Sequence, residues 1–160
     1  MVFLPPLEDV LFRGVTNLSL DAKGRVAIPA RYRDRLTEAA DGRLVVTVDR
    51  DGCLLLYPFP EWERIEQALM ARPNMDKQVR RLQRLLLGHA TECELDSQGR
   101  ILLPTPLREF ARLDKKAVLV GQGNKFELWD EDTWIGQRDA WLREEEESGE
   151  LSAALESLSL

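Results

Sequence analysis

The feature that most constrains the fold of this chain of 160 residues is an internal repeat. The segment LDAKGRVAIP at 20–29 returns as LDSQGRILLP at 95–104, and Val46-Thr47-Val48 corresponds to Val118-Leu119-Val120. Each copy spans about 45 residues, a size at which an isolated core is only marginally stable. The repeat therefore predicts two copies of one β-rich unit that share a core and pack as a pseudo-dimer within the chain.

The composition, with 44% hydrophobic and 31% charged residues, is ordinary for a globular protein. No apolar run approaches the ~18 residues of a membrane span, so we expect no membrane partner. The first 14 residues lack a basic segment and carry two prolines and two acids, which is unlike a signal peptide. Cys53 and Cys93 are isolated, and this pattern favours reduced thiols in a cytoplasmic protein.

The formal net charge of −6 conceals a segregation of charge along the chain. Residues 13–35 hold six basic residues against two acidic ones, whereas the matching window 88–110 holds two basic residues against four acidic ones. The tail at 143–160 holds one arginine against six glutamates. We therefore expect an anionic partner to meet the first copy.

Hydrophobic periodicity and turn residues predict the order of the elements. Alternation predicts a strand on each side of the turn at 21–24 and two further strands around 49–52, and the second copy repeats this order. Helical spacing predicts helices at 60–71 and 76–87 and another that begins near Asp130. The expected organisation is an N-terminal arm at 1–11, a first repeat domain at 12–58, a helical connector at 59–87, a second repeat domain at 88–131, a C-terminal helix at 132–148 and an acidic mobile tail at 149–160.

The residues argue against catalysis. The chain has a single histidine, His89, so no Ser-His-Asp or Cys-His set can be assembled without it, and no metal-ligand spacing of Cys and His occurs. The run Gly121-Gln122-Gly123-Asn124 lacks the spacing of a phosphate-binding loop and favours a hairpin turn. We therefore predict no catalytic residues, no metal and no cofactor.

The repeated Asp-x-x-Gly-Arg unit is the most specific motif. In both copies the aspartate and arginine could form an ion pair that stabilises the turn, and we predict this structural role for Asp21, Gly24, Asp96, Gly99 and Arg100. In the first copy, further cations surround the turn, and guanidinium groups suit both phosphate oxygens and guanine edges. We therefore predict a DNA-binding set of Arg13, Lys23, Arg25, Arg31, Arg33 and Arg35. A further cluster, Arg72, Lys77, Arg80, Arg81 and Arg84, has helical spacing and favours a solvated face or pairing with the acids of a neighbouring subunit.

The segments FRGVTNLSLDAKGRVAIPARYRDRL at 12–36, GHATECELDSQGRILLPTPLREFA at 88–111 and VLVGQGNKFELWD at 118–130 resemble the bacterial MraZ family. These proteins contain two tandem AbrB-like (SpoVT-AbrB) units, each with a D-x-x-x-R motif, and Asp21/Arg25 and Asp96/Arg100 are the versions here. The resemblance covers residues 12–142. MraZ proteins usually begin directly before the residue that corresponds to Phe12, so residues 1–10 depart from the family pattern, as does the tail after about Arg143.

The resemblance implies an α+β, β-rich fold, in which the tandem units form a double-split, swapped-hairpin β-barrel pseudo-dimer with flanking helices. It also implies a ring-shaped homo-oligomer that binds double-stranded DNA at direct repeats upstream of division and cell-wall genes. Such a protein would often repress those genes and its own gene, in the cytoplasm and at the nucleoid. AbrB-type units also occur in antitoxins, so the alternative is a protein–protein interaction module, antitoxin-like or a scaffold ring, with no specific DNA target.

Overall fold

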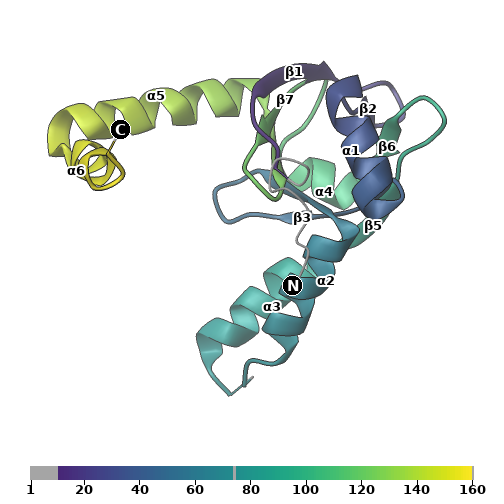
Figure 1. Ribbon diagram of the computed structural model, residues 1–160, viewed down its shortest axis with the longest axis horizontal. Coiled ribbons are helices and arrows are strands. Elements are labelled where there is room, and N and C mark those ends of the chain that lie inside the picture. The colour runs from purple at the N-terminus through teal and green to yellow at the C-terminus, as the bar shows by residue number, and fades with distance from the viewer. Residues whose placement is uncertain (1–10, 74, 160) are drawn as a thin grey trace, which may run out of the picture. The chain divides into compact units, whose positions relative to one another are not determined.

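The two copies of the repeat build one antiparallel sheet and one short two-stranded ribbon (Figure 1). The structure is a computed structural model that describes residues 11–73 and 75–159. The first copy supplies the strands β1 (Val15–Ser19), β2 (Arg25–Ala27), β3 (Arg43–Val48) and β4 (Leu54–Pro58), and the second copy supplies β5 (Thr91–Glu94), β6 (Arg100–Leu102), β7 (Lys116–Gly121) and β8 (Phe126–Asp130). The helices are α1 (Ala30–Ala40), α2 (Phe59–Met70), α3 (Lys77–His89), α4 (Thr105–Phe110), α5 (Glu131–Ser148) and α6 (Glu150–Ser157).

Strand pairing interlaces the two copies. The sheet has the order β1-β7-β8-β4-β3-β5, so β1 of the first copy pairs with β7 of the second, and β5 of the second pairs with β3 of the first. Strands β4 and β8 join the two halves at the centre. The remaining strand of each copy, β2 or β6, pairs only with its counterpart in the other copy. Each copy therefore completes the sheet of the other.

This pairing confirms the α+β class and corrects the local hairpins that we expected around 21–24 and 96–99. Among the described residues β1 and β2 form no ladder with each other, and an isolated bridge joins Leu20, directly after β1, to Val26, because the ladder partners of both strands come from the second copy. A closed barrel is not found in the part of the chain that the structure describes, since β1 and β5 form the edges of an open sheet. The barrel is therefore not confirmed.

Alternation along the central strands separates two apolar clusters. Leu44 and Val46 of β3 face the larger cluster, in which residues of both copies are buried together, such as Ile28 and Ile101. Val45 points to the opposite face, where it packs with Tyr57, Trp62 and the helical connector. This period of two is what a sheet covered on both faces requires. The copies consequently share one core, as the repeat predicts.

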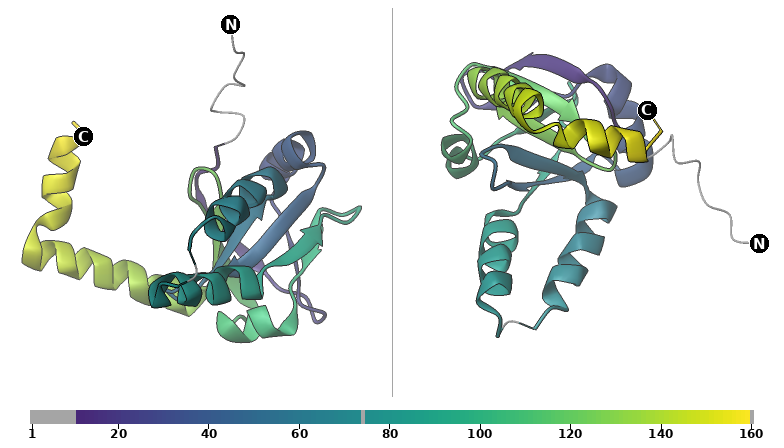
Figure 2. Two further views of the ribbon diagram at one scale, coloured as in Figure 1. Left: turned by 90° about the horizontal axis from the view of Figure 1, so that it is seen from below. Right: turned by 90° about the vertical axis from the view of Figure 1, so that its left-hand side faces the viewer.

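The connector forms an antiparallel helical pair, α2 and α3, that extends away from the sheet (Figures 1 and 2). The Asp76 carboxylate caps α3 by accepting a hydrogen bond from the Gln78 amide at 2.8 Å. Gln83 of α3 donates to the Leu69 carbonyl of α2 at 3.0 Å and ties the two helices together. Within the described residues, none of the helices combines the length and apolar content that crossing a lipid bilayer would take.

The C-terminal residues from Glu131 form a separate compact unit. Helix α5 lies where a C-terminal helix was expected, but α6 occupies residues that we expected to form a mobile tail. The Glu145 carboxylate stabilises α6, because it accepts hydrogen bonds from the amides of Leu151 and Ser152 at 2.8 and 3.2 Å. The arm predicted at 1–11 lies outside the described residues except for Leu11. The other predicted boundaries stay predictions.

The shared core predicts that a cavity in one copy destabilises both. The ring centre of Phe126, in the second copy, lies 4.3 Å from the ring centre of Phe12 and 4.9 Å from that of Tyr32, both in the first copy. We expect Phe126→Ala to lower the free energy of unfolding by about 3–5 kcal/mol. In urea, circular dichroism and tryptophan fluorescence should report one coincident transition, earlier than in the wild type. Two separated transitions would contradict a shared core.

Candidate nucleic-acid interface

The two Asp-x-x-Gly-Arg motifs fold into the same turn. Asp21 Oδ1 accepts hydrogen bonds from the amides of Lys23 at 3.0 Å and Arg25 at 2.9 Å. In the second copy, Asp96 Oδ1 accepts from the amides of Gln98 at 2.9 Å and Arg100 at 2.8 Å. An aspartate at the first position therefore satisfies the backbone donors that the turn would leave unpaired.

The same carboxylates orient the arginines. The second oxygen of Asp21 accepts from Arg25 Nε at 2.7 Å, and that of Asp96 accepts from Arg100 Nε at 2.9 Å. Both arginine side chains are 28% exposed. Because Nε is held by the aspartate, the two terminal amino groups of each guanidinium remain as donors at the end of the side chain. Each motif thus presents a guanidinium in a fixed orientation.

The β2–β6 ribbon places the two motifs side by side. In its register, Arg25 is opposite Leu102 and Ala27 is opposite Arg100. Arg100 Nη1 consequently lies 4.0 Å from Asp21 Oδ2, so the arginine of the second copy is within reach of the carboxylate of the first. The charge pattern of the sequence suggested that the first copy alone would meet an anion, but the structure brings both arginines into one site.

A reciprocal pair of arginines packs over the turns. Arg33 of the first copy donates to the Ile28 carbonyl at 2.6 Å, and its guanidinium covers Gly99 of the second copy. Arg108 of the second copy donates to the Leu103 carbonyl at 3.0 Å and covers Gly24 of the first. Arg33, which we predicted to bind DNA, is therefore half-buried as a structural contact. We call Arg33 and Arg108 the cross-copy clamps.

Each clamp requires a glycine beneath it for two reasons. Gly24 and Gly99 have φ values of 85° and 73°, a region that residues with a Cβ adopt at a cost. A Cβ on Gly24 would also lie 2.6 Å from Arg108 Nε, and one on Gly99 would clash with Arg33 Nε. The glycine of the motif thus fits both the bend of the turn and the approach of an arginine from the other copy.

The remaining predicted cations lie in a separate hollow. Arg13, Arg31 and Arg35 line this hollow together with Tyr32, and its lining includes none of the ribbon residues. Arg31 donates to the Thr16 hydroxyl and lies 4.7 Å from the centre of the Tyr32 ring, and Arg35 donates to the Leu11 carbonyl at 2.7 Å. Of the six predicted DNA-binding residues, only Lys23 and Arg25 therefore belong to the ribbon site.

Sequence reasoning missed three cations beside the first turn. Arg108, Lys115 and Lys116 line a surface hollow together with Asp21 and Ala22. The repeat could have identified Arg108, which corresponds to Arg33 at the offset of 75. No local pattern identifies the lysines, because they reach this turn through the pairing of β1 with β7, in which Lys116 is opposite Ser19. Cations of the second copy therefore supplement the first turn.

Hydrogen bonding keeps both motif carboxylates ionised. The backbone amide of Arg25 lowers the pKa of Asp21 below its ordinary value, with further contributions from the Arg25 side chain and the Lys23 amide. The pKa of Asp96 is lowered in the same way, chiefly by the amide of Arg100. These hydrogen bonds therefore extend towards lower pH the range in which the aspartates are anionic partners of the arginines.

One other group of side chains could be considered as a metal site. Ligand atoms of Asp49, Cys53 and Glu127 lie within 4.8 Å of one another, the only such group that was found among the described residues. Burial strongly raises the pKa of the Cys53 thiol and also raises the pKa of Glu127. A protonated thiol is a poor metal ligand, so this group does not favour a metal.

His89, whose Nδ1 lies 2.8 Å from the Leu85 carbonyl, caps the end of α3.

Comparison with known proteins gives a consistent result. The family model described as "MraZ protein, putative antitoxin-like" matches residues 11–85 and again 86–153. Three relatives are each named transcriptional regulator MraZ. The chain is 77% identical over 150 residues to that of Thioalkalivibrio sulfidiphilus, with 94% of this chain and 100% of the relative covered. It is 61% identical over 134 residues to that of Methylococcus capsulatus (84% and 88%) and 52% identical over 151 residues to that of Pseudomonas aeruginosa (94% and 100%).

The cross-copy clamps predict that substitution by alanine destabilises Gly24 and Gly52 differently, although the two glycines share a backbone conformation. Gly52 has a φ of 95°, but a Cβ there meets nothing within 4 Å, unlike one on Gly24. We expect Gly52→Ala to cost about 1–2 kcal/mol for the backbone alone. Gly24→Ala should cost more in urea unfolding, because Arg108 is displaced as well. In an Arg108→Ala background this excess should disappear, and an unchanged excess would argue against the clamp.

The lowered pKa values predict a pH dependence of stability. A carboxyl group with a lowered pKa stabilises the folded state above its unfolded-state pKa, and this contribution is lost as the pH falls through the folded-state value. In NMR titrations, we expect the carboxyl carbons of Asp21 and Asp96 to titrate below the ordinary aspartate value of 3.8. Asp21→Asn should flatten the loss of stability in this acid range. Titration of both groups at or above 3.8 would contradict the hydrogen bonding described here.

Proposed function

The chain belongs to the MraZ family, and from this premise we propose that it is a sequence-specific DNA-binding transcriptional regulator that reads DNA with the β2–β6 ribbon. The observation that carries the proposal is the pair of oriented, partly exposed arginines, Arg25 and Arg100, on one two-stranded ribbon. The relatives from three organisms carry the name of transcriptional regulator, which supports the same function.

A two-stranded antiparallel ribbon suits direct readout of a duplex. The major groove of B-DNA admits such a ribbon, and arginine most often reads guanine there through O6 and N7. The bond from Asp21 to Arg25 Nε leaves the terminal amino groups to form this fork. Since the aspartate fixes the guanidinium before binding, less side-chain freedom is lost on the DNA. We infer that Arg25 and Arg100 read base edges.

The cations beside the first turn would position the ribbon on the phosphate backbone. Lys23 lies in the turn and is exposed, and Lys115 and Lys116 line the adjacent hollow. Contacts to phosphates supply affinity without sequence information and weaken as the salt concentration rises. Arg13, Arg31 and Arg35 would serve in the same way on a flanking segment of the duplex.

The finer expectations from the family form part of the proposal. The regulator would act as a repressor at direct repeats upstream of division and cell-wall genes and of its own gene, at the nucleoid and as a ring homo-oligomer. One ribbon engages few phosphates and would bind weakly at cellular ionic strength. A ring that presents identical ribbons to successive repeats would raise the apparent affinity by about 10²–10⁴ through effective concentration.

A second candidate function is a protein–protein interaction module that acts in the manner of an antitoxin. The wording of the matching family model, antitoxin-like, favours it. In this case the cations would meet an acidic protein surface. Competition between DNAs distinguishes the two functions. A regulator bound to the DNA upstream of its own gene should stay bound in an excess of random DNA, whereas an interaction module would show no preference for the upstream DNA over random DNA.

The ribbon predicts equal roles for its two arginines. The sequence alone favoured a smaller effect for Arg100, but the two side chains have the same exposure and the same type of partner. We expect Arg25→Ala and Arg100→Ala each to weaken specific binding by about 1–3 kcal/mol, measured by fluorescence anisotropy on DNA from upstream of the gene. Arg64→Ala, which removes an arginine paired with Glu61 at 2.6 Å on α2, is the matched control and should change the affinity by less than about twofold.

A phosphate contact should behave differently in the same assay. Lys23→Ala should weaken binding to specific and random DNA alike and reduce the salt slope by about 1. Unchanged affinity of both arginine variants at moderate salt would overturn the ribbon as the reading element. A large loss from Arg25→Ala alone would restore the asymmetry that the charge pattern of the sequence suggested.

A further inference from the structure

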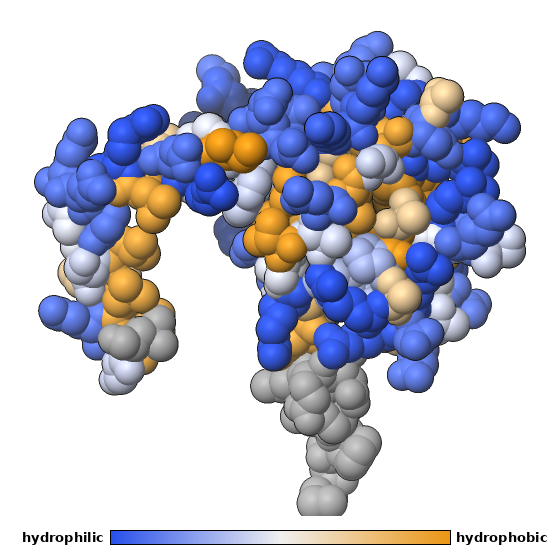
Figure 3. All heavy atoms as spheres, turned by 90° about the horizontal axis from the view of Figure 1, so that it is seen from above, coloured by the Kyte–Doolittle hydropathy of each residue, from blue (hydrophilic) through white to orange (hydrophobic). Residues whose placement is uncertain are grey.

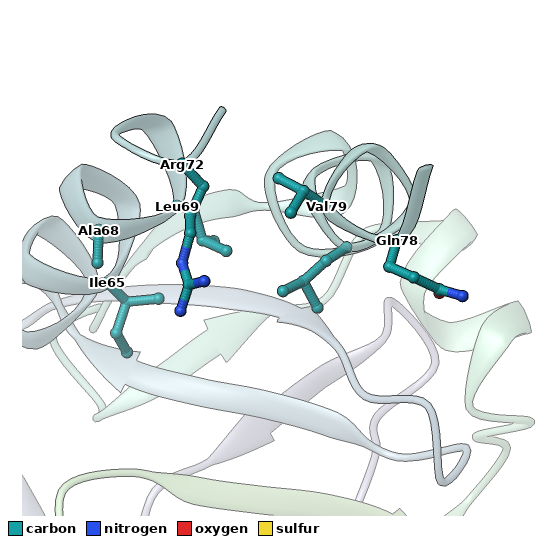
Figure 4. A pocket seen from close by; sticks show the side chains of 7 residues that line it. Ile65, Ala68, Leu69, Arg72, Gln78 and Val79 are labelled. Carbon is teal, nitrogen blue, oxygen red and sulfur yellow. The ribbon is translucent and has the colours of Figure 1, made fainter. Parts of the chain in front are cut away.

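The helical pair carries an apolar groove that is separate from the DNA-reading ribbon. Ile65, Ala68 and Leu69 line it from α2, and Val79 and Leu82 line it from α3. Figure 4 shows Ile65, Ala68 and Leu69 on one helix and Val79 on the facing helix, with the side chain of Arg72 between the two helices. Leu82 is 46% exposed although it lies on the apolar face of its helix. A groove of this kind suits an amphipathic helix with apolar residues spaced at i, i+4 and i+7.

The C-terminal unit carries a helix of this kind. Leu151 and Leu155 of α6 and Leu158, which caps its C-terminal end, follow one another at i, i+4 and i+7 and are 51%, 38% and 67% exposed. Figure 3 shows hydrophobic residues gathered on this unit among hydrophilic ones. The cap that Glu145 provides fixes the start of α6, so the stripe is presented by a helix that is already formed. Docking it therefore does not require the segment to fold first.

The two surfaces carry opposite charges. Residues 72–84, which cover the connection between the two helices and the first part of α3, hold five basic residues and one acidic residue, Asp76. The segment 143–160, which contains α6, holds one arginine against six glutamates. Arg81 and Arg84 are exposed on α3, as are Glu146 and Glu147 at the end of α5. Docking of these two surfaces would therefore place the apolar stripe in the apolar groove and the glutamates beside the arginines.

We propose that α6 of one copy docks into the α2–α3 groove of a second copy, with Glu146 and Glu147 at the end of α5 beside Arg81 and Arg84. The proposal rests on the ring oligomer of the proposed function and assigns the surfaces that form it. The ring of the proposed function requires contacts between copies, so a second copy is the partner.

This contact would be of the head-to-tail kind. The groove and the helix are different surfaces, so each copy would offer a groove to one neighbour and a helix to the other. Interfaces of this heterologous kind close into rings when the rotation permits it. The ribbon would take no part in the contact and would remain available for DNA.

Site-specific crosslinking between two variants that each carry one added cysteine tests the contact. Full-length Val79→Cys and Leu155→Cys, one of them carrying a mass tag, are mixed under mild oxidation. We expect a disulfide that joins one tagged and one untagged chain. The native Cys53 and Cys93 are buried, so the wild-type protein should give no such product. The proposal would be overturned if no disulfide joined a tagged to an untagged chain while the Val79→Cys/Leu155→Cys double variant formed a disulfide within single chains. That result would indicate docking within one copy.

Charge reversal provides a second and independent test, by sedimentation without DNA. We expect the double variants Arg81→Glu/Arg84→Glu and Glu146→Arg/Glu147→Arg each to raise the protein concentration needed for assembly at least tenfold. An equimolar mixture of the two variants should recover part of the assembly. Glu38→Arg, exposed on α1, is the control and should assemble like the wild type. Unchanged assembly of both reversed variants would overturn the proposal. Binding of these variants to a single DNA box should be retained, so failure of the interface is distinguishable from failure of the proposed function.

Discussion

The rest of the structure depends on the exchange of strands between the two copies. Strand β1 has its ladder partner in the second copy, and β5 has its partner in the first. One copy alone would leave a two-stranded hairpin and unpaired strands, too little to cover an apolar face. The buried core accordingly contains residues of both copies, such as Ile28 and Ile101. Stability and the geometry of the site therefore have one origin.

The exchange also builds the site. Strands β2 and β6 pair only with each other, so the two Asp-x-x-Gly-Arg turns converge on one ribbon instead of lying on separate domains. The cross-copy clamps hold each turn with an arginine from the other copy. Each glycine leaves room for a clamp, and each aspartate fixes both the backbone of its turn and the guanidinium that follows. If the ribbon reads DNA as proposed, an element prepared in this way would need little rearrangement on the duplex.

Local patterns in the sequence identify what depends on local interactions. The aspartate turns, the strand pairs β3–β4 and β7–β8, and helices α2, α3 and α5 follow from alternation, capping and helical spacing. The partner of β2 does not, because a three-residue strand that alternates carries no information on which strand it will join. Arg33 is the clearest example at the site. It belongs to a basic cluster by sequence, but its neighbour Gly99 comes from the other copy. Helix α6 was missed because its cap, Glu145, lies in the preceding helix.

The most direct test of the account is an NMR titration with duplex DNA from upstream of the gene, in which the arginine Nε–Hε signals are followed. The account predicts that the signals of Arg25 and Arg100 shift together, while those of the cross-copy clamps Arg33 and Arg108 change little because they remain bonded to backbone carbonyls. Shifts confined to Arg13, Arg31 and Arg35, with the ribbon arginines unchanged, would contradict the claim that strand exchange creates the reading surface.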